Sequence, residues 1–317
     1  MPGPNTTYSN FYLSNEVEDQ FNSHLNLQQF CTVDNNLVGT AGMKRKINVY
    51  SATNGTEKLA ITAGNTQSIT VGFIQKEYEI LLAQNRFKYY DEEAMTDPMI
   101  VPVGMRHAGT DMFNTVNADI FAEFNKATQV VVVSALDFAA FADAESMFNS
   151  ENLQDENIFG FVCPADVAAI RKALKEDLKY VESFSRNGYI GTVAGMNLYT
   201  KKDAVAGTIC TATKKAVTLF NKKGVEVEQS TRASRSADDA NVRLNTIFTR
   251  KYYLAAITNL TKAVKIVKGT ATACPSTETT VDSSKTYYAK SGLGYVEVTP
   301  ASGDNPYTKG WYTIAAA

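Results

Sequence analysis

The stretch VGFIQKEYEILLAQNRFKYYDEEAMTDPMIVPVGMRHAGTDMFN, residues 71–114, changes its hydrophobic period halfway along. In its first part, apolar residues such as Val71 and Phe73 alternate with polar ones, which indicates a strand. After two prolines, apolar residues recur at spacings of three, four and seven, which indicates one face of a helix. The stretch therefore predicts a strand that leads into a long helix, which we place at residues 103–127.

A long hairpin is predicted upstream, over residues 44–82. Apolar and polar residues alternate at both of its ends, and turn-forming pairs such as Asn54-Gly55 stand between them. The N-terminal segment, residues 1–40, is rich in Asn, Gln, Ser and Thr and is interpreted as an arm. An isolated two-stranded hairpin is marginally stable at best in water. We therefore expect both the hairpin and the arm to lie on another surface.

The middle of the chain alternates strands and helices. An apolar run at residues 129–134 predicts a buried strand, and Ser134–Asp137 resembles a capping box that starts a helix through Asn149. Residues 158–163 repeat the plan, with Pro164 in the first turn of the following helix. This alternation predicts an α/β layer.

Strand signals dominate the next part of the chain. We expect a hairpin over residues 216–229 that turns at Lys223-Gly224, a long strand within 242–257, and a polar loop between the two. Residues 269–317 differ in composition, because Thr, Ser, Gly, Tyr and Pro dominate there. A segment of this size buries only a thin core, so it is interpreted as a small β module that rests on the main body.

The composition is that of an ordinary folded protein, with 317 residues, 44% of them hydrophobic and 20% charged. A formal charge of −2 argues against a dedicated nucleic-acid binder, and no apolar run approaches the roughly 20 residues of a membrane helix. The opening MPGPNTTYSN lacks the basic start and apolar core of a secretion signal, so we expect cytoplasmic synthesis. The cysteines are widely spaced and are expected to be free, buried thiols: Cys31, Cys163, Cys210 and Cys274.

No motif predicts a catalytic residue, a cofactor or a metal site. Gly188, Gly191 and Gly195 follow a predicted helix, whereas phosphate-binding glycines follow a strand and open a helix. His107 has Asp111 one helical turn later but no nucleophile motif beside it, so we expect a solvated or inter-subunit pair.

Two acidic runs also carry no metal signature. Residues 91–93 lack the alternating ligands and the glycine of a calcium loop, and we expect a solvated loop before the long helix. Asp238-Asp239 is interpreted in the same way, although the neighbouring Arg232, Arg235 and Arg243 suit an ion-pair network.

The order of these parts resembles the major capsid protein of tailed bacteriophages, which has the Hong Kong 97-type fold. The resemblance covers about residues 20–268 and rests on the opening stretch, on FVCPADVAAIRKAL (161–174) and on GYIGTVAGMNLYTKKDAV (188–205). It implies an α+β fold with a small C-terminal β module added. The implied parts are an N-terminal arm (1–40), an extended β-hairpin loop (41–85), a peripheral domain (86–134 and 241–268) with spine helix 103–127, an axial domain (135–240) and the module (269–317).

The resemblance also implies that the hairpin lies over the next subunit. Small basic clusters are usually solvated, but on such a hairpin they suit pairing with acids of a neighbour. The three glycines of 188–195 would let the backbone turn tightly and let a neighbour approach. The candidate inter-subunit contacts are Lys44, Arg45, Lys46, Asn54, Gly55, Arg106, His107, Asp111, Gly188, Gly191 and Gly195.

The function implied is structural: a major capsid protein, not an enzyme, that self-assembles into an icosahedral shell around phage genomic DNA. Its implied partners are further copies of itself in hexamers and pentamers, a portal, scaffold or decoration proteins, and packaged double-stranded DNA bound non-specifically, with no membrane. The implied location is the virion, after assembly in the bacterial host cytoplasm.

Three alternatives stay open at this point. An encapsulin-like compartment shell shares the same fold but encloses protein cargo. A nucleotide-binding α/β enzyme is the rival from a different class, and nucleotide-dependent thermal stabilisation would favour it. A tail or decoration protein with a surface-binding module would remain a small oligomer.

Overall fold

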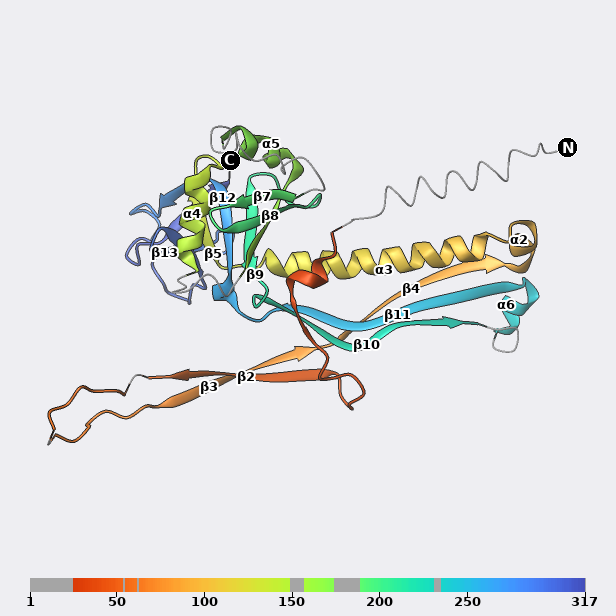
Figure 1. The fold of residues 1–317 in the computed structure, drawn as a ribbon, viewed down its shortest axis with the longest axis horizontal. Helices are drawn as coiled ribbons and strands as arrows, with labels where there is room; N and C mark the ends of the chain where they lie inside the picture. The colour runs from red at the N-terminus through yellow and green to blue at the C-terminus, as the bar shows by residue number, and fades with distance from the viewer. Residues whose placement is uncertain are drawn as a thin grey trace. The chain divides into compact units, whose positions relative to one another are not determined.

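The computed structural model describes residues 25–53, 55–61, 63–148, 157–173, 189–230 and 235–316 (Figure 1). The chain divides into two compact units. The first unit comprises Met1–Val33, Phe113–Leu219 and Ala255–Ala317, and the second comprises Asp34–Met112 and Phe220–Leu254. Three long elements contribute to both units: α3 (Ile100–Phe124), β10 (Val217–Gln229) and β11 (Leu244–Ile257).

The second unit carries the predicted hairpin. β2 (Lys44–Ala52) pairs antiparallel with β3 (Val71–Glu79) as a separate two-stranded sheet, which confirms the hairpin predicted over residues 44–82. β4 (Leu81–Tyr90) follows at once and pairs antiparallel with β11 in a four-stranded sheet of order β1-β10-β11-β4, where β1 is Thr32–Asp34. The predicted passage from strand to long helix is confirmed as well, because β4 leads through α2 (Asp91–Thr96) into α3.

The N-terminal half of α3 packs closely on β4. A β-carbon added at Gly104 would lie 2.5 Å from the Phe87 ring, so only glycine permits this approach. Asn85 Nδ2 donates hydrogen bonds to the backbone oxygen of Ala108 at 2.9 Å and to Asp111 Oδ2 at 3.0 Å. These contacts hold the helix along the strand that precedes it.

Three local predictions in the second unit were wrong. β10 runs unbroken through Lys223-Gly224, where a hairpin turn was expected, because β11 is a partner long enough to hold the whole strand extended. The acidic residues 91–93 form the first turn of α2, where their charges suit the helix dipole, and not a loop. The expected loop before β11 contains the short helix α6 (Ala237–Asn241), because Ser236 Oγ caps it by accepting from Asp239 N.

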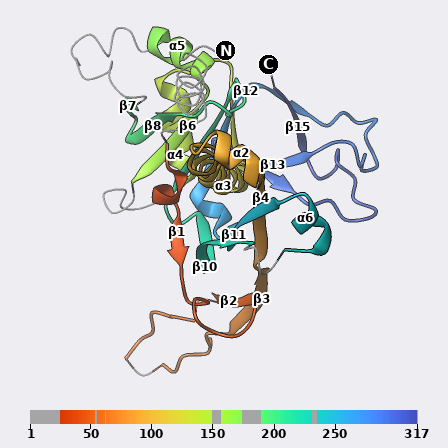
Figure 2. The ribbon, with the colours of Figure 1, turned by 90° about the vertical axis from the view of Figure 1, so that its right-hand side faces the viewer.

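The first unit is built on a nine-stranded sheet (Figures 1 and 2). Its order is β15-β13-β14-β5-β12-β9-β6-β8-β7. The strands of the central part are β5 (Gln129–Val133), β6 (Ile158–Val162), β7 (Tyr189–Val193), β8 (Met196–Thr200), β9 (Thr208–Thr213) and β12 (Ala263–Ala273), the last preceded by the short 3-10 helix η4 (Leu260–Lys262). β5 with β12 and β6 with β8 are parallel pairs, which confirms the predicted α/β layer.

Helices cover one face of this sheet. α4 (Phe138–Met147) and α5 (Pro164–Ala173) pack on it, as predicted from the apolar spacing and from Pro164. The start of α4 differs from the prediction, because Asp137 caps the helix by accepting from Ala140 N at 3.0 Å, while Leu136 is drawn into the core. The core on this side contains Val131, Leu136, Phe141, Ile158, Ile170, Leu198, Ile209 and Ile266.

An aromatic cluster occupies the other face. β6 alternates its side chains, so that Phe159 and Phe161 point away from the α4 face and meet Phe124 of α3. The 3-10 helix η1 (Leu27–Phe30) adds Phe30, whose ring centroid lies 4.8 Å from those of Phe159 and Tyr199. The segment predicted to be an arm thus lies, from residue 25 onward, on the body of its own chain.

The C-terminal strands join the main sheet and close a ring. β14 (Gly294–Val298) pairs with β5, β13 (Tyr287–Ser291) pairs with β14 and β15 (Tyr312–Ala316), and β15 pairs with the extension of β12 beyond Gly269. β12 and β5 pair with each other, so the five strands form a closed circuit. Inside it, Cys274, Tyr287 and Trp311 form a small core, as the thin core predicted for this module requires.

Candidate assembly interface

The hairpin formed by β2 and β3 exposes its distal apolar residues. Tyr50, Val71, Phe73 and Ile74 have relative exposures of 65%, 62%, 62% and 71%. Single exposed apolar residues are common on protein surfaces, but a contiguous group marks an interaction site. The two rings Tyr50 and Phe73 stand opposite each other with centroids 5.9 Å apart, and they find no other cover in the described part of the second unit.

The register divides these side chains between two faces of the ribbon. Tyr50, Phe73 and Val71 share one face, because residues directly opposite and residues two apart point the same way. Val49 and Ile74 are paired on the other face. Toward the base of the ribbon the first face becomes polar, since Asn48 lies opposite Gln75 and accepts a hydrogen bond from its Nε2 at 3.2 Å.

The base of the hairpin, in contrast, is firmly fixed within the second unit. Ile80, between β3 and β4, is 3% exposed, and its backbone nitrogen donates to Met43 O at 2.8 Å. Tyr78 stacks on the buried Phe220 ring of β10. Lys222 Nζ donates to the backbone oxygens of Leu37, at 3.1 Å, and of Thr40.

The predicted basic cluster lies at this base and is paired within its own chain. Lys44 Nζ lies 2.9 Å from Glu77 Oε1 and Lys46 Nζ lies 3.8 Å from Glu77 Oε2, while Arg45 Nε lies 3.4 Å from Asp34 Oδ2. Hydrogen bonding to Glu77 raises the pKa of Lys44, and the same bond lowers the pKa of Glu77. The two lysine pairs with Glu77 are exposed and therefore weak, so an acid of another molecule can compete for the lysines.

A further hairpin candidate, Gly55, follows the end of β2. Gly55 approaches the returning chain so closely that an added β-carbon would lie 2.7 Å from Ile69 N. Glycine is therefore required there for the two segments to meet. Asn54 lies outside the described residues.

The helical candidates lie on the N-terminal half of α3. Arg106 is exposed, and His107 is half-buried one turn before Asp111. Asp111 is held by Asn85 of β4, as described above. The structure therefore places these residues on one element without gathering them into a site with a nucleophile.

The predicted glycines shape a strand-to-strand turn. Gly191 has a φ of 111° and lies at an irregularity in the pairing of β7 with β8, and Gly195 has a φ of 74° in the two-residue turn that joins these strands. Ala194 beside it also has a positive φ of 45°, as such hairpin turns demand. The expected helix-to-strand turn is thus a hairpin turn at Gly195, and Gly188 lies outside the described residues.

A charged cluster at the start of α2 was only partly anticipated. Arg235 Nη1 and Nη2 donate to the two carboxylate oxygens of Asp91 at 3.3 and 3.1 Å, and Asn245 Nδ2 donates to Asp91 Oδ1 at 2.6 Å. Arg243 also pairs with Glu92 at 3.2 Å. The sequence indicated arginine pairing near residue 238, but the acids used lie almost 150 residues earlier in the chain.

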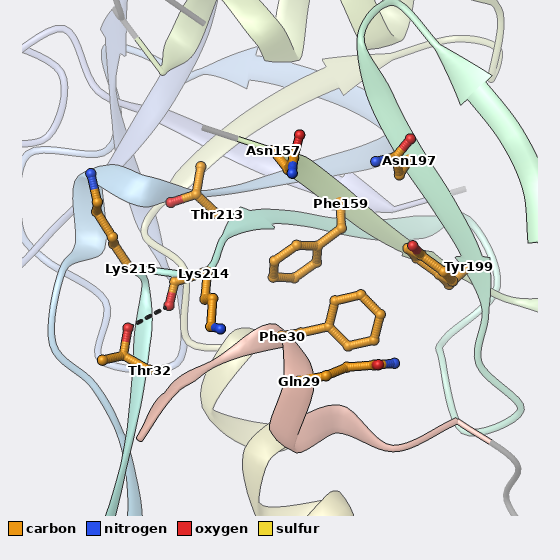
Figure 3. A pocket seen from close by; sticks show the side chains of 10 residues that line it. All are labelled: Gln29, Phe30, Thr32, Asn157, Phe159, Asn197, Tyr199, Thr213, Lys214 and Lys215. Carbon is orange, nitrogen blue, oxygen red and sulfur yellow. Dashed lines mark hydrogen bonds between the residues drawn. The ribbon is translucent and has the colours of Figure 1, made fainter. Parts of the chain in front are cut away.

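A cavity of about 640 Å³ opens in the first unit beside the aromatic cluster (Figure 3). Figure 3 shows Phe30 and Phe159 side by side, and two lysine side chains that leave the turn between β9 and β10 in different directions. Thr32 Oγ1 donates to the backbone oxygen of Lys214 at 3.0 Å and closes one side. The lining residues are Gln29, Phe30, Thr32, Asn157, Phe159, Asn197, Tyr199, Thr213, Lys214 and Lys215.

The cysteines are free thiols, as predicted, three of them buried and Cys163 half-buried. Burial raises the pKa of Cys210 to about 12 and that of Cys31 to about 11, so both stay protonated at neutral pH. Within the described ranges no group of His, Cys, Asp and Glu is arranged to hold a metal ion. No helix there is both long and apolar enough to cross a membrane.

Neither a protein-family model nor a curated protein sequence matches this chain. Solved structures do match it. The capsid of cyanophage P-SCSP1u is similar with a TM-score of 0.58 at 12% identity, over 75% of this chain and 86% of that one. The capsid of a native GTA particle gives 0.58 at 13% identity over 76% and 89%, and Mycobacterium phage Che8 gives 0.56 at 15% over 74% and 89%. The chain therefore has the capsid fold of the Hong Kong 97 type, as the pattern of its sequence predicted.

Proposed function

We propose that this chain is the major capsid protein of a tailed bacteriophage and that its copies assemble into an icosahedral shell around the phage genome. The exposed apolar hairpin on a capsid fold is the observation that carries the proposal. Burying apolar surface is worth about 25 cal/mol per Å², so the distal ribbon gains stability only where another molecule covers it. In a shell, a neighbouring copy of the same chain buries this apolar surface.

The parts of the chain take their roles from this arrangement. Residues 41–85 form the extended loop that lies over a neighbouring copy, and the helix within 100–124 is the spine of the peripheral domain. Residues 135–240 form the axial domain, and residues 269–317 add a small β module that rests on the main body. The exposed ion pairs of Lys44 and Lys46 with Glu77 become contacts in the assembly when an acid of the neighbour replaces Glu77.

The partners follow from the same role. Each copy contacts further copies in hexamers and pentamers, and the complete shell adds a portal and scaffold or decoration proteins. A formal charge of −2 suits a container that holds DNA without gripping it, because non-specific phosphate binding grows with basic excess. The protein is structural and not catalytic, it is assembled in the bacterial host cytoplasm, and its place is the virion.

Electron microscopy of the expressed chain tests the proposal. We expect discrete polyhedral shells from the wild-type chain and none from Tyr50→Ser/Phe73→Ser, because this variant removes two exposed rings of the hairpin without touching a core. Leu293→Ser/Tyr307→Ser is the matched control, since it changes two exposed apolar residues outside the hairpin. Circular dichroism should show all three chains folded.

Two outcomes would contradict the proposal. The first is a wild-type chain that stays monomeric under every condition, and the second is a hairpin variant that assembles as well as the control. The contents of the shells then separate the phage capsid from the encapsulin-like alternative. Nuclease-resistant DNA inside particles from infected cells is expected for the capsid, whereas a protein cargo without DNA contradicts it.

A further inference from the structure

The four-stranded sheet of the second unit has two edges that lack a full-length partner. β4, with 10 residues, has β11 as its only neighbour in the described part of the chain. On the other side of β11, β10 is 13 residues long, whereas its outer neighbour β1 has 3. Figure 1 shows β11 running between β4 and β10. Open strand edges of this kind are ready to pair with a strand of another molecule.

The backbone of β4 directs hydrogen-bonding groups to its open edge. The N–H of Tyr90 donates to Glu93 Oε2 at 3.0 Å and therefore points away from β11. β4 pairs with β11 without a register shift, and the backbone groups of such a strand alternate between its two sides. The N–H and C=O groups of every second residue thus point to the open edge, namely those of Leu82, Gln84, Arg86 and Lys88.

β10 directs a similar set of groups to its own open edge. The N–H of Ser230 donates to Thr246 O of β11 at 2.9 Å. By the same alternation, the backbone groups of Val225, Val227 and Gln229 point away from β11. The two valine side chains are each 54% exposed, so this part of the strand is open to another molecule.

Two unpaired cations lie on the outer face of β4, which is the face opposite α3. Asn85 is hydrogen-bonded to α3, so Arg86 and Lys88 point to the other face. Both are exposed, and neither has an acidic partner among the described residues. Cations on an edge strand discourage pairing with strands of arbitrary sequence. They favour a strand that brings acids at the same two-residue spacing.

β10 carries acids at this spacing. Glu226, which is 40% exposed, pairs with Lys223. Glu228, which is 64% exposed, pairs with Arg250, and Arg250 lies opposite Gln84 on the outer face of the sheet. Because a carboxylate accepts hydrogen bonds at both oxygens, each acid can bind a second cation and keep the first. One open edge of the sheet thus carries free cations, and the other carries acids.

The other face of β10 is apolar along the same stretch. Gln229 Nε2 donates to Tyr89 Oη on the α3 face of the sheet at 2.8 Å. By alternation, Val225 and Val227 lie on this face too. The β4 strand of another copy would place its half-buried Phe87 beside them and remove apolar surface from water.

We propose that the sheet continues from one copy of the chain into the next, with the open edge of β4 paired to the open edge of β10 of a neighbouring copy. The two cations of β4 then meet the two acids of β10. The inference rests on the proposed self-assembly and deepens it, because it names two surfaces that meet. The two edges differ, so the contact is head-to-tail, and such a contact closes into a ring when the rotation between copies allows it.

Charge reversal tests the contact in shell assembly. R86E/K88E reverses one edge and E226K/E228K reverses the other, so each variant places like charges across every contact. We expect each to give at least about tenfold fewer shells than wild type on a density gradient, with unchanged circular dichroism. The chain with all four changes again has opposite charges on its two edges and should recover shells.

The control makes a matching charge change outside the two edges. Lys202→Glu/Lys290→Glu alters two exposed lysines of the first unit and should assemble like wild type. A loss of shells in R86E/K88E but not in this control is therefore assigned to the edge and not to the net charge of the chain.

Hydrogen exchange resolved to single amides measures the strand pairing directly. The amides of residues 82, 84, 86 and 88 and of residues 225, 227 and 229 should exchange at least about tenfold more slowly in wild-type shells than in the unassembled chain. The amides of residues 83, 85 and 87 point to β11 and should be protected in both states, which makes them an internal control.

Three results would overturn the contact while the capsid function stands. The first is a wild-type yield of shells from R86E/K88E or E226K/E228K, and the second is a folded four-change chain that recovers none. The third is exchange at residues 225, 227 and 229 that is equally fast in both states, because β4 then has another partner, such as the hairpin of a neighbour, or none. If the four-change chain does not fold, the exchange of the wild-type shells decides. A wild-type chain that forms no shells overturns the proposed function itself.

Discussion

Tyr78 stacks on Phe220 with ring centroids 5.0 Å apart and an angle of 26° between the planes. Tyr78 belongs to β3 of the exposed hairpin, and Phe220 is a fully buried residue of β10. The contact lies where the ribbon changes from covered to exposed. It therefore fixes the direction in which the hairpin leaves the sheet of its unit.

Removing either ring should weaken this attachment. We expect Phe220→Ala to cost about 3–5 kcal/mol of unfolding free energy, because it empties a buried site. Tyr78→Ala should cost less, and the coupling between the two changes should be about 0.5–1.5 kcal/mol. Urea unfolding of the two single variants and the double variant measures this coupling. Phe73→Ala is the control, since its exposed ring should change the stability of the unassembled chain by less than about 0.5 kcal/mol.

The anchor of the N-terminal segment rests on one buried side chain. Asn117 is 1% exposed, its Oδ1 accepts from Leu27 N at 3.1 Å, and its Nδ2 donates to Leu25 O at 3.3 Å. Asn117→Ala leaves both backbone groups without this partner and should cost about 1–3 kcal/mol. Thermal unfolding and the rate of proteolysis before residue 30 should both report it. Asn48→Ala, at an exposed site of the hairpin, should change neither, and equal effects of the two variants would contradict the anchor.

Local patterns predicted the elements better than their partners. The alternation in β3 and the helical spacing after Pro102 are short-range signals, and both elements form, although the helix spans Ile100–Phe124 where 103–127 was expected, because Pro102 lies within its first turn. The sequence around Gly224 favours a turn, yet β10 continues through this residue. Backbone pairing with β11 outweighs the weak turn preference of a single glycine.

The contacts missed by sequence reasoning join residues far apart in the chain. Asp91 meets Arg235 across 144 positions, and Thr32 meets Lys214 across 182. The periodicity of a sequence does not indicate which distant residues will meet, because the topology of the sheets decides those contacts. The two-stranded ribbon was predicted, since its own residues decide it. Its exposed apolar side chains were not, because the hairpin was expected to be polar, and neither was the cavity at Lys214.

Closure of the C-terminal ring depends on a position that cannot hold a side chain. A β-carbon at Gly269 of β12 would overlap the backbone oxygen of Ala315 in β15. Gly269→Ala should therefore push the strands apart, cost about 1–3 kcal/mol and expose Trp311, which a red shift of its fluorescence would show. Gly224→Ala is the control, because its β-carbon would meet nothing within 4 Å. A red shift in the control, or none in Gly269→Ala, would contradict the closed ring.

The same module should lose stability in acid through Glu278. Hydrogen bonds from Lys285 Nζ at 2.8 Å and from Tyr287 Oη at 2.7 Å lower the pKa of Glu278 below its ordinary 4.5. An acid whose pKa is lower in the folded state than in the unfolded state stabilises the fold at pH values above its unfolded-state pKa. This stabilisation is lost as the pH falls through the folded-state pKa. The unfolding free energy followed by Trp311 fluorescence should therefore decline below pH 4.5, and Glu278→Gln should flatten that decline.

Other ionisable groups of the module also change its stability with pH, and the test has to be separated from their effects. The pKa of Asp282 is lowered by Ser284 and that of Asp304 by the backbone of Ala301, both from an ordinary 3.8, so some acid sensitivity should remain in Glu278→Gln. Hydrogen bonding to Glu278 raises the pKa of Lys285 above 10.5, and its contribution should be lost only as the pH rises through that higher value. Glu297→Gln, at an exposed site on β14, should follow the wild-type curve. An acid decline equally steep in wild type and Glu278→Gln would show that the Glu278 contacts do not stabilise the ring.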